Sequence, residues 1–144
     1  NSILVGNLDV GGTTTIGGAV SIAGALSVGG VANFGATVLA KTDTDTSNTG
    51  SVTLDFSANQ NFVLTLTGNL TLANPSTEQV GQSGIICCIQ DGTGSRTLSS
   101  GTDYETAGGA GITLSTGANA VDIIPYFVKA TGSIQLGAVQ LAFS

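Results

Sequence analysis

Three acidic side chains, Asp103, Glu105 and Asp122, are the residues of this sequence that could do hydrolytic chemistry. A pair of carboxylates can cleave a glycosidic bond, with one acting as acid and the other as base or nucleophile. The chain has no histidine, so the commonest general base is missing and Ser-His-Asp and Cys-His arrangements are excluded. It also has no tryptophan, 2 tyrosines and 5 phenylalanines, few aromatic rings for binding a polysaccharide. We therefore expect no catalytic residues and no enzyme activity.

Two short motifs could hold a ligand. Asp43 and Asp45 hint at a calcium site, but their segment lacks the glycine and the final glutamate of an EF-hand-like loop. The run Gly92-Thr93-Gly94 followed by Arg96 resembles a phosphate loop, yet it lacks the lysine and the strand-loop-helix context. We interpret the first motif as a solvated linker and the second as a turn. We expect no metal ion and no cofactor.

The two cysteines, Cys87 and Cys88, are adjacent within an apolar run. Neighbouring residues of a strand point to opposite faces, so a disulfide between them would need a distorted backbone. A CxxC metal motif is absent from the sequence. We interpret both cysteines as small apolar side chains of a strand.

Charge is sparse, with 3 basic residues against 9 acidic ones and a net charge of −6. The basic residues Lys41, Arg96 and Lys129 are scattered, so the chain lacks the basic footprint that nucleic-acid binding needs. No apolar run reaches the roughly 18 residues of a membrane span. We expect neither nucleic-acid binding nor membrane insertion.

A six-residue repeat occupies residues 1–40, the first element that must be placed. Glycine recurs at Gly6, Gly12, Gly18, Gly24 and Gly30, and Ala36 continues the series. The other even positions are mostly aliphatic, whereas the odd positions are mostly small or polar: the even series is Leu8, Val10, Thr14, Ile16, Val20, Ile22, Leu26, Val28, Ala32, Phe34, Val38 and Ala40. Because side chains of an extended chain alternate between faces, this pattern predicts a strand that bends at glycine corners. Such periodicity is typical of a β-helix or β-prism.

The repeat is too short to close a coil within one chain. A triangular coil needs three hexads, so residues 1–40 would give about two coils, fewer than the ~3 repeats usually needed for stability. Three copies winding together would close each other's edges. We therefore predict a homotrimeric shaft, with Gly18 and Gly24 at inward corners that have no room for a side chain. The alternative is a short left-handed β-helix folded within a single chain.

Residues 51–144 follow a polar linker, residues 41–50, and predict a jelly-roll-like β-sandwich head domain. Gly68-Asn69 is interpreted as a turn between two strands, and residues 101–111 as a long loop. The apolar runs that start at Ile85 and Val121 are expected to form the head core or the trimer interface, the first as a central strand buried on both faces. The other predicted strands are built around Val52–Phe56, Phe62–Leu66, Leu70–Leu72, Ile112–Leu114 and Ile134–Phe143.

Tyr104 lies in that long loop between Asp103 and Glu105. Tyrosine can stack on sugars or fill an interface. An exposed Tyr104 at the distal tip would suit host recognition. We favour the other interpretation, in which Tyr104 packs against its own domain or a neighbouring subunit.

Three stretches carry a family resemblance: LTLTGNLTLANP, GQSGIICCIQDGTGSRTL and TLSTGANAVDIIPY, all within residues 62–128. They resemble a C-terminal domain of structural proteins in tailed bacteriophages, and GNLDVGGTTTIGGAVSIAGALSVGG resembles the shaft repeats that often precede it. The Cys87-Cys88 pair departs from the branched aliphatic residues expected there. The resemblance implies a fibre or spike on the virion surface and carries over no catalytic or ligand-binding residues.

The function expected from this resemblance is that of a homotrimeric tail fibre component whose head domain could recognise a host glycan or protein. The alternative is a capsid-attached head fibre or decoration protein. The chain lacks an initiator methionine and its repeat is already under way at Ser2. We therefore expect upstream sequence that attaches the fibre to other virion proteins.

Overall fold

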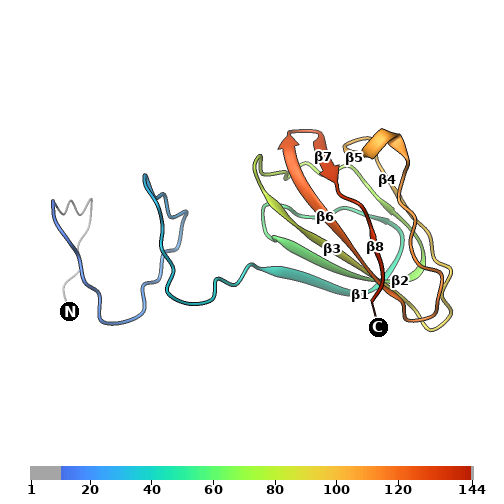
Figure 1. Ribbon diagram of the computed structural model, residues 1–144, viewed down its shortest axis with the longest axis horizontal. Coiled ribbons are helices and arrows are strands. Elements are labelled where there is room, and N and C mark those ends of the chain that lie inside the picture. Colours follow the sequence, from blue (N-terminus) through green and yellow to red (C-terminus); the bar gives the residue numbers. More distant parts are fainter. Residues whose placement is uncertain (1–10, 144) are drawn as a thin grey trace. The chain divides into compact units, whose positions relative to one another are not determined.

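The computed structural model describes residues 11–143 and divides the chain into two units: a repeat unit, residues 1–37, and a sheet unit, residues 38–144 (Figure 1). The early repeat positions Gly6, Leu8 and Val10 lie outside the described residues.

The repeat unit bends at intervals of six residues. The bends fall at residues 11–12, 17–18, 23–24, 29–30 and 35–36, and each includes a glycine of the predicted corner series or its substitute Ala36. Between bends the backbone forms no hydrogen-bonded strand in residues 11–37, and every side chain there is exposed. A Cβ added at Gly18 or Gly24 would meet no atom within 4 Å. The crowding predicted at these corners is therefore absent from a single chain.

The sheet unit is built from strands, which confirms the all-β prediction. The strands are β1 (Thr42–Val52), β2 (Asn61–Leu72), β3 (Ser83–Gln90), β4 (Leu98–Ser100), β5 (Tyr104–Thr106), β6 (Val121–Ala130), β7 (Ser133–Leu136) and β8 (Gln140–Phe143). One short 3-10 helix is found among the described residues: η1 (Ala107–Gly109), which follows β5.

These strands form one mixed sheet in the order β1-β2-β3-β6-β7-β5, with β4 paired to β2 and β8 paired to β6. β1, β2 and β3 run parallel, β6 is antiparallel to β3, β7 and β8, and β5 is parallel to β7. This differs from the predicted jelly-roll-like sandwich. Parallel neighbours need a crossover, and residues 73–82 supply the one between β2 and β3.

The polar segment predicted as the 41–50 linker is instead most of β1. Its sequence, TDTDTSNTGSV, lacks an apolar face, but it is rich in β-branched threonine and pairs with β2 through the backbone. The side chain of Asn48 is buried and donates to the backbone oxygens of Asp45 and Thr65, at 3.1 and 3.2 Å. These bonds lie beside a register shift in the pairing. The sheet unit therefore begins well before residue 51.

Two further predictions at strand ends are wrong. Gly68 and Asn69 do not turn the chain; they lie inside β2, where a Cβ on Gly68 would meet the Thr49 hydroxyl at 2.2 Å. Glycine at position 68 lets β1 approach β2 closely. Ile112 and Leu114 form no strand, and Leu114 is buried from a loop.

The core lies on one face of the sheet and is formed largely by the even-numbered side chains of β2, β3 and β6. Phe62, Leu64, Leu66, Ile86 and Ile124 are all almost fully buried. The odd-numbered residues of β3 are exposed or only partly buried, so the prediction that this strand is buried on both faces is wrong for a single chain.

An aromatic cluster closes one end of this core. Phe56 packs edge-on against Phe62 and Tyr126, with ring centroids 5.1 and 5.2 Å apart. The Tyr126 hydroxyl donates to the backbone oxygen of Gln60 at 2.6 Å. Gly84 leaves room for this contact, because a Cβ there would lie 2.1 Å from the same oxygen.

The sheet curls over its core. β4 pairs with β2, whereas β5 is at the far edge, yet only residues 101–103 join them. Three residues span at most about 10 Å, so the far edge must return close to β2. Asn74 holds the connection: its amide donates to Thr102 Oγ1 at 2.9 Å and accepts from the Asp103 amide at 3.1 Å.

Candidate functional site

The long loop predicted at residues 101–111 contains β5 and η1, and it places Tyr104 inside the sheet unit. Tyr104 is 6% exposed, so the favoured packing interpretation is confirmed and the exposed-tip interpretation is wrong. Its hydroxyl is buried with no hydrogen-bond partner among the described residues. Burial, together with the nearby carboxylates of Glu78 and Asp103, raises the pKa of this phenol. Tyr104 cannot stack on a ligand from this position.

The three candidate carboxylates serve local structure. Glu105 accepts a hydrogen bond from Ser133 Oγ at 2.8 Å and pairs with Lys129 at 3.4 Å, and the Ser133 bond is the main cause of its lowered pKa. Asp122 is buried and accepts from the Ser115 hydroxyl and amide, both at 2.7 Å, and from the Ala142 amide at 2.8 Å.

The position of Asp122 does not match a glycosidase pair with Glu105. Asp122 and Lys129, the ion-pair partner of Glu105, are seven residues apart on β6, which corresponds to about 23 Å. Paired glycosidase carboxylates lie about 5–9.5 Å apart. Asp103 lies at the β5 edge, close to Gly132, and accepts a long 3.5 Å hydrogen bond from Thr102 Oγ1.

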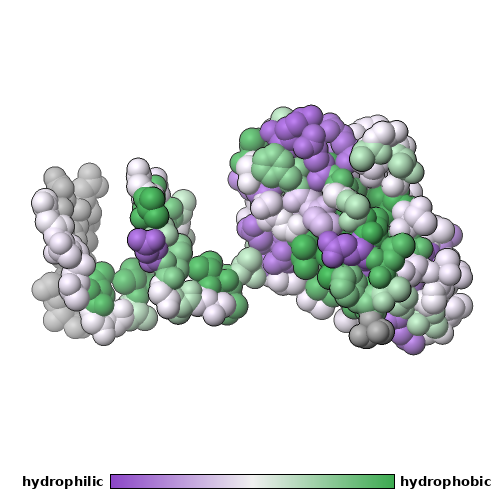
Figure 2. Space-filling model, viewed as in Figure 1, coloured by the Kyte–Doolittle hydropathy of each residue, from purple (hydrophilic) through white to green (hydrophobic). Residues whose placement is uncertain are grey.

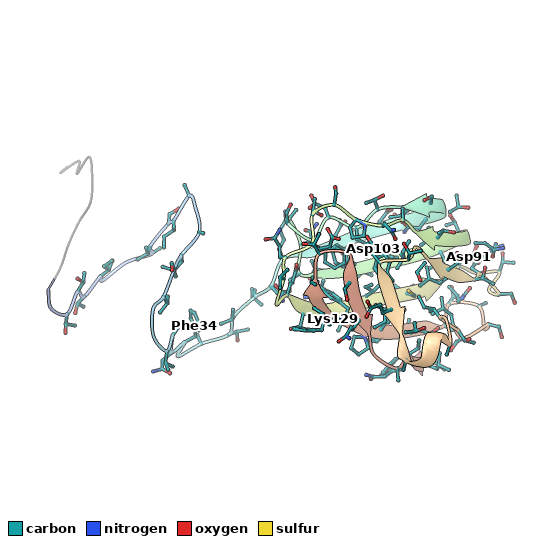
Figure 3. All side chains as sticks on the ribbon, turned by 90° about the horizontal axis from the view of Figure 1, so that it is seen from above. Phe34, Asp91, Asp103 and Lys129 are labelled. Atoms are coloured by element: carbon teal, nitrogen blue, oxygen red, sulfur yellow. The ribbon has the colours of Figure 1, made fainter. Side chains whose placement is uncertain are left out.

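The motif Gly92-Thr93-Gly94 is a turn, as predicted, and Asp91 organises it. One oxygen of Asp91 accepts the amides of Thr93 and Gly94 at 3.0 and 2.9 Å, and the other accepts Nε and Nη2 of Arg96 at 3.1 and 2.8 Å. The hydrogen bond from Arg96 lowers the pKa of Asp91 to about 2. Asp91 and Lys129 lie at different ends of the sheet unit in Figure 3.

The remaining ligand candidates are also local. Asp45 accepts the Ser47 amide at 3.1 Å, and the described residues contain no cluster of three metal-ligating side chains. Both cysteines are free thiols on opposite sides of β3: Cys88 is buried in the core, and Cys87 faces outward and is half-buried. Burial raises the pKa of Cys88 to about 12.

A groove that the sequence did not predict lies at the N-terminal ends of β1, β2 and β3. It measures about 530 Å³ and is lined by Lys41, residues 56–60 and residues 79–83 except Val80. Amide side chains dominate it: those of Asn59, Gln60, Gln79 and Gln82. Gln82 donates to the Asn59 backbone oxygen at 2.7 Å, and its own Oε1 is buried without a partner among the described residues. Three separate segments build this groove, so no local motif signals it.

A second, apolar cavity of about 240 Å³ lies between residues 106–112 and residues 136–139. Ile112, Ile124, Leu136 and Val139 contribute its larger side chains. Its volume falls below the range of about 300–1,000 Å³ that is typical of ligand pockets.

The outer face of β3 and β6 is apolar rather than polar. After Ser83, which pairs with Phe127, the odd-numbered residues of β3 are Ile85, Cys87 and Ile89, and they pair with Pro125, Ile123 and Val121 of β6. Phe127 extends the row and is 45% exposed. Hydrophobic surface is visible over the sheet unit in Figure 2.

The comparisons with known proteins identify the family. Residues 48–133 match the family described as "Putative phage tail fibre C-terminal domain". This match spans more than half of the chain, and the protein therefore belongs to that family. It is a virion-associated protein of the phage tail fibre class. Neither the curated proteins nor the solved structures contain a match. Within residues 11–143, no helix is long and apolar enough to span a bilayer.

Proposed function

We propose that this chain is a structural part of a homotrimeric tail fibre, in which three repeat units wind into a β-helical shaft and three sheet units form the head. The single observation that carries the proposal is the periodic exposure of apolar side chains in the repeat unit. Ile16, Val20, Leu26 and Phe34 are 60, 59, 63 and 65% exposed, and all lie on the even series between six-residue bends. Figure 3 draws Phe34 on an extended trace.

Exposure of this kind is costly for an isolated chain. Burying one such aliphatic or aromatic side chain contributes about 1.5–3 kcal/mol, so a line of them is a strong driving force for association. Within residues 11–37 no other strand of the same chain pairs with the extended segments. This favours closure between copies over the alternative of a left-handed β-helix within one chain.

Light scattering on the purified chain tests the oligomeric state. The expected mass is three times 14.1 kDa. A folded species of 14.1 kDa at micromolar concentration would contradict the proposal. Imaging virions labelled on this protein separates a tail fibre from the alternative, a capsid-attached head fibre or decoration protein.

Host-surface recognition by the sheet unit is a second proposal, supported by the amide-lined groove. Amide side chains donate to and accept from sugar hydroxyls, and four of the residues that line the groove carry one. Gln79 is exposed on the groove wall. We expect Gln79→Ala to weaken host-cell binding without changing the mass of the trimer. Unchanged binding of this variant and of Asn59→Ala would contradict a role for the groove.

A further inference from the structure

The outer face of β3 and β6, called the outer apolar face below, differs from the solvated face of an ordinary sheet. Such sheets alternate apolar residues toward the core with polar residues toward water. β2 follows this rule, since its outward residues include Thr65, Thr67 and Thr71. The outer apolar face does not: Ile85, Cys87, Ile89, Val121, Ile123, Pro125 and Phe127 are its seven members.

Charge is absent from this face although the chain carries a net charge of −6. The acidic residue of β6, Asp122, points inward and is buried. The first charged side chain along the outward row is Lys129, beyond Phe127, and Gln135 pairs with Phe127 from β7. An apolar centre with a polar rim is the usual anatomy of a protein interface. Copies of an acidic chain can approach each other here without bringing carboxylates together.

The connection between the repeat unit and the sheet unit is short. The repeat unit ends at Thr37, and the backbone oxygen of Lys41 already accepts the amides of Gln60 and Asn61 at 2.8 and 3.1 Å. The intervening residues 38–40 span at most about 10 Å. If three repeat units are wound together, each sheet unit is therefore held beside two others at a high effective concentration.

We infer that the outer apolar face packs against the sheet unit of a neighbouring copy of this chain. The inference rests on the proposed trimer and names the surface through which the heads meet. Cys87 lies in the middle of the face, paired with Ile123 and flanked by Ile85 and Ile89. Its thiol should be covered in the assembled fibre and half-exposed in a separated chain.

A thiol probe on the full chain tests this placement. A maleimide should label Cys87 slowly in the trimer and at least about tenfold faster once the trimer is dissociated by dilution, whereas Cys88 should stay protected until the sheet unfolds. Phe127→Asp should raise the concentration needed for assembly by about tenfold or more, equivalent to about 1.4 kcal/mol. The matched control is Val80→Asp, because Val80 is an exposed apolar residue outside the face, at 66%.

The outcomes separate this inference from the proposed trimer. A wild-type chain that remains a monomer overturns the trimer itself. A wild-type trimer whose Cys87 reacts as fast as the dissociated chain overturns the interface only, and so does an unchanged assembly midpoint for Phe127→Asp. The milder variant Phe127→Thr replaces Phe127→Asp if the latter does not fold, and the wild-type labelling rates need no variant. Rapid labelling of Cys87 in the trimer would mean that nothing in the purified trimer covers this face. A different virion protein would then be its occupant in the virion.

Discussion

The repeat unit and the sheet unit use the same alternation of apolar and polar residues, with opposite results. In β2 and β3 the even-numbered side chains Phe62, Leu64 and Ile86 are buried by other strands of the same chain. In the repeat unit the even-numbered Ile16 and Val20 stay mostly exposed. Alternation therefore specifies which face of a strand must be covered, whereas long-range contacts decide whether the same chain can cover it. Substitutions that act on only one unit test whether the two units differ in this way.

The largest effect is expected for Gly84→Ala, which acts within the sheet unit. The new Cβ would lie 2.1 Å from the backbone oxygen of Gln60. Unlike the end of a side chain, this backbone oxygen cannot rotate out of the way. The change should destabilise the sheet unit by about 1–3 kcal/mol or more through overpacking. Thermal unfolding followed by circular dichroism measures it.

The matched control for this prediction is Gly117→Ala, where the nearest atom to an added Cβ is 3.8 Å away. It should change stability by less than about 0.5 kcal/mol. Equal melting temperatures for the two variants would show that the close approach at Gly84 does not constrain the fold.

A smaller effect, and one of a different kind, is expected for Gly18→Val in the repeat unit. One chain offers no atom within 4 Å of the new Cβ, so the cost can arise only between copies. The variant should raise the concentration for trimer assembly by about tenfold or more, with the sheet unit still folded. Light scattering across a dilution series measures this shift.

Ser21→Val is the control, since Ser21 belongs to the odd, outward series of the same repeat. If both valine variants assemble as the wild type does, the even series does not face the shaft interior. The comparison between the two units would then need a different explanation.

A pH-dependent effect is expected at the Asp91 turn. The hydrogen bond from Arg96 lowers the Asp91 pKa from 3.8 to about 2 in the folded chain. A lowered folded-state pKa adds stability above the unfolded value of 3.8, and this stability is lost as the pH falls toward about 2. Asp91→Asn should flatten the dependence of melting temperature on pH between about 4 and 2. Asp103→Asn is the control. If Asp91→Asn has the same dependence of melting temperature on pH as the wild type, Asp91 does not have this role.

The smallest effect is expected for Tyr104→Phe, which tests how complete the core of the sheet unit is. The hydroxyl of Tyr104 is buried without a partner in the described chain, so its removal relieves a desolvation cost. The melting temperature should stay the same or rise slightly. A destabilised Tyr104→Phe would indicate a hydrogen bond to this hydroxyl.

Local patterns predicted the long strands that have an apolar face, but they also predicted a strand at Ile112–Leu114 that does not form. The alternation in β2 and the apolar runs of β3 and β6 are visible in the sequence, and so is the turn after Asp91. β1 was missed because its stability comes from backbone pairing with β2 rather than from its own apolar residues. The parallel order of the sheet, and the groove built from three segments, depend on long-range contacts that no local motif encodes.

The candidate site residues were affected in the same way. Tyr104 could be recognised as an aromatic residue of a long segment, but its direction depends on β5 pairing with β7, which follows thirty residues later in the chain. The outer apolar face required the pairing of β3 with β6 before its seven members could be seen as neighbours. The sequence located the apolar runs, and the register assigned each residue to a face.

The spacing of the bends also bears on how such a fibre could change during evolution. Six is an even number, so an in-frame duplication or deletion of one whole hexad, such as residues 13–18, leaves every later even residue on the same face of the strand. A change by an odd number of residues would turn the apolar series to the opposite face. Length in this segment can therefore vary in steps of one repeat while the apolar series keeps the same face of the strand. The reach of the fibre and the chemistry of its head can be selected independently.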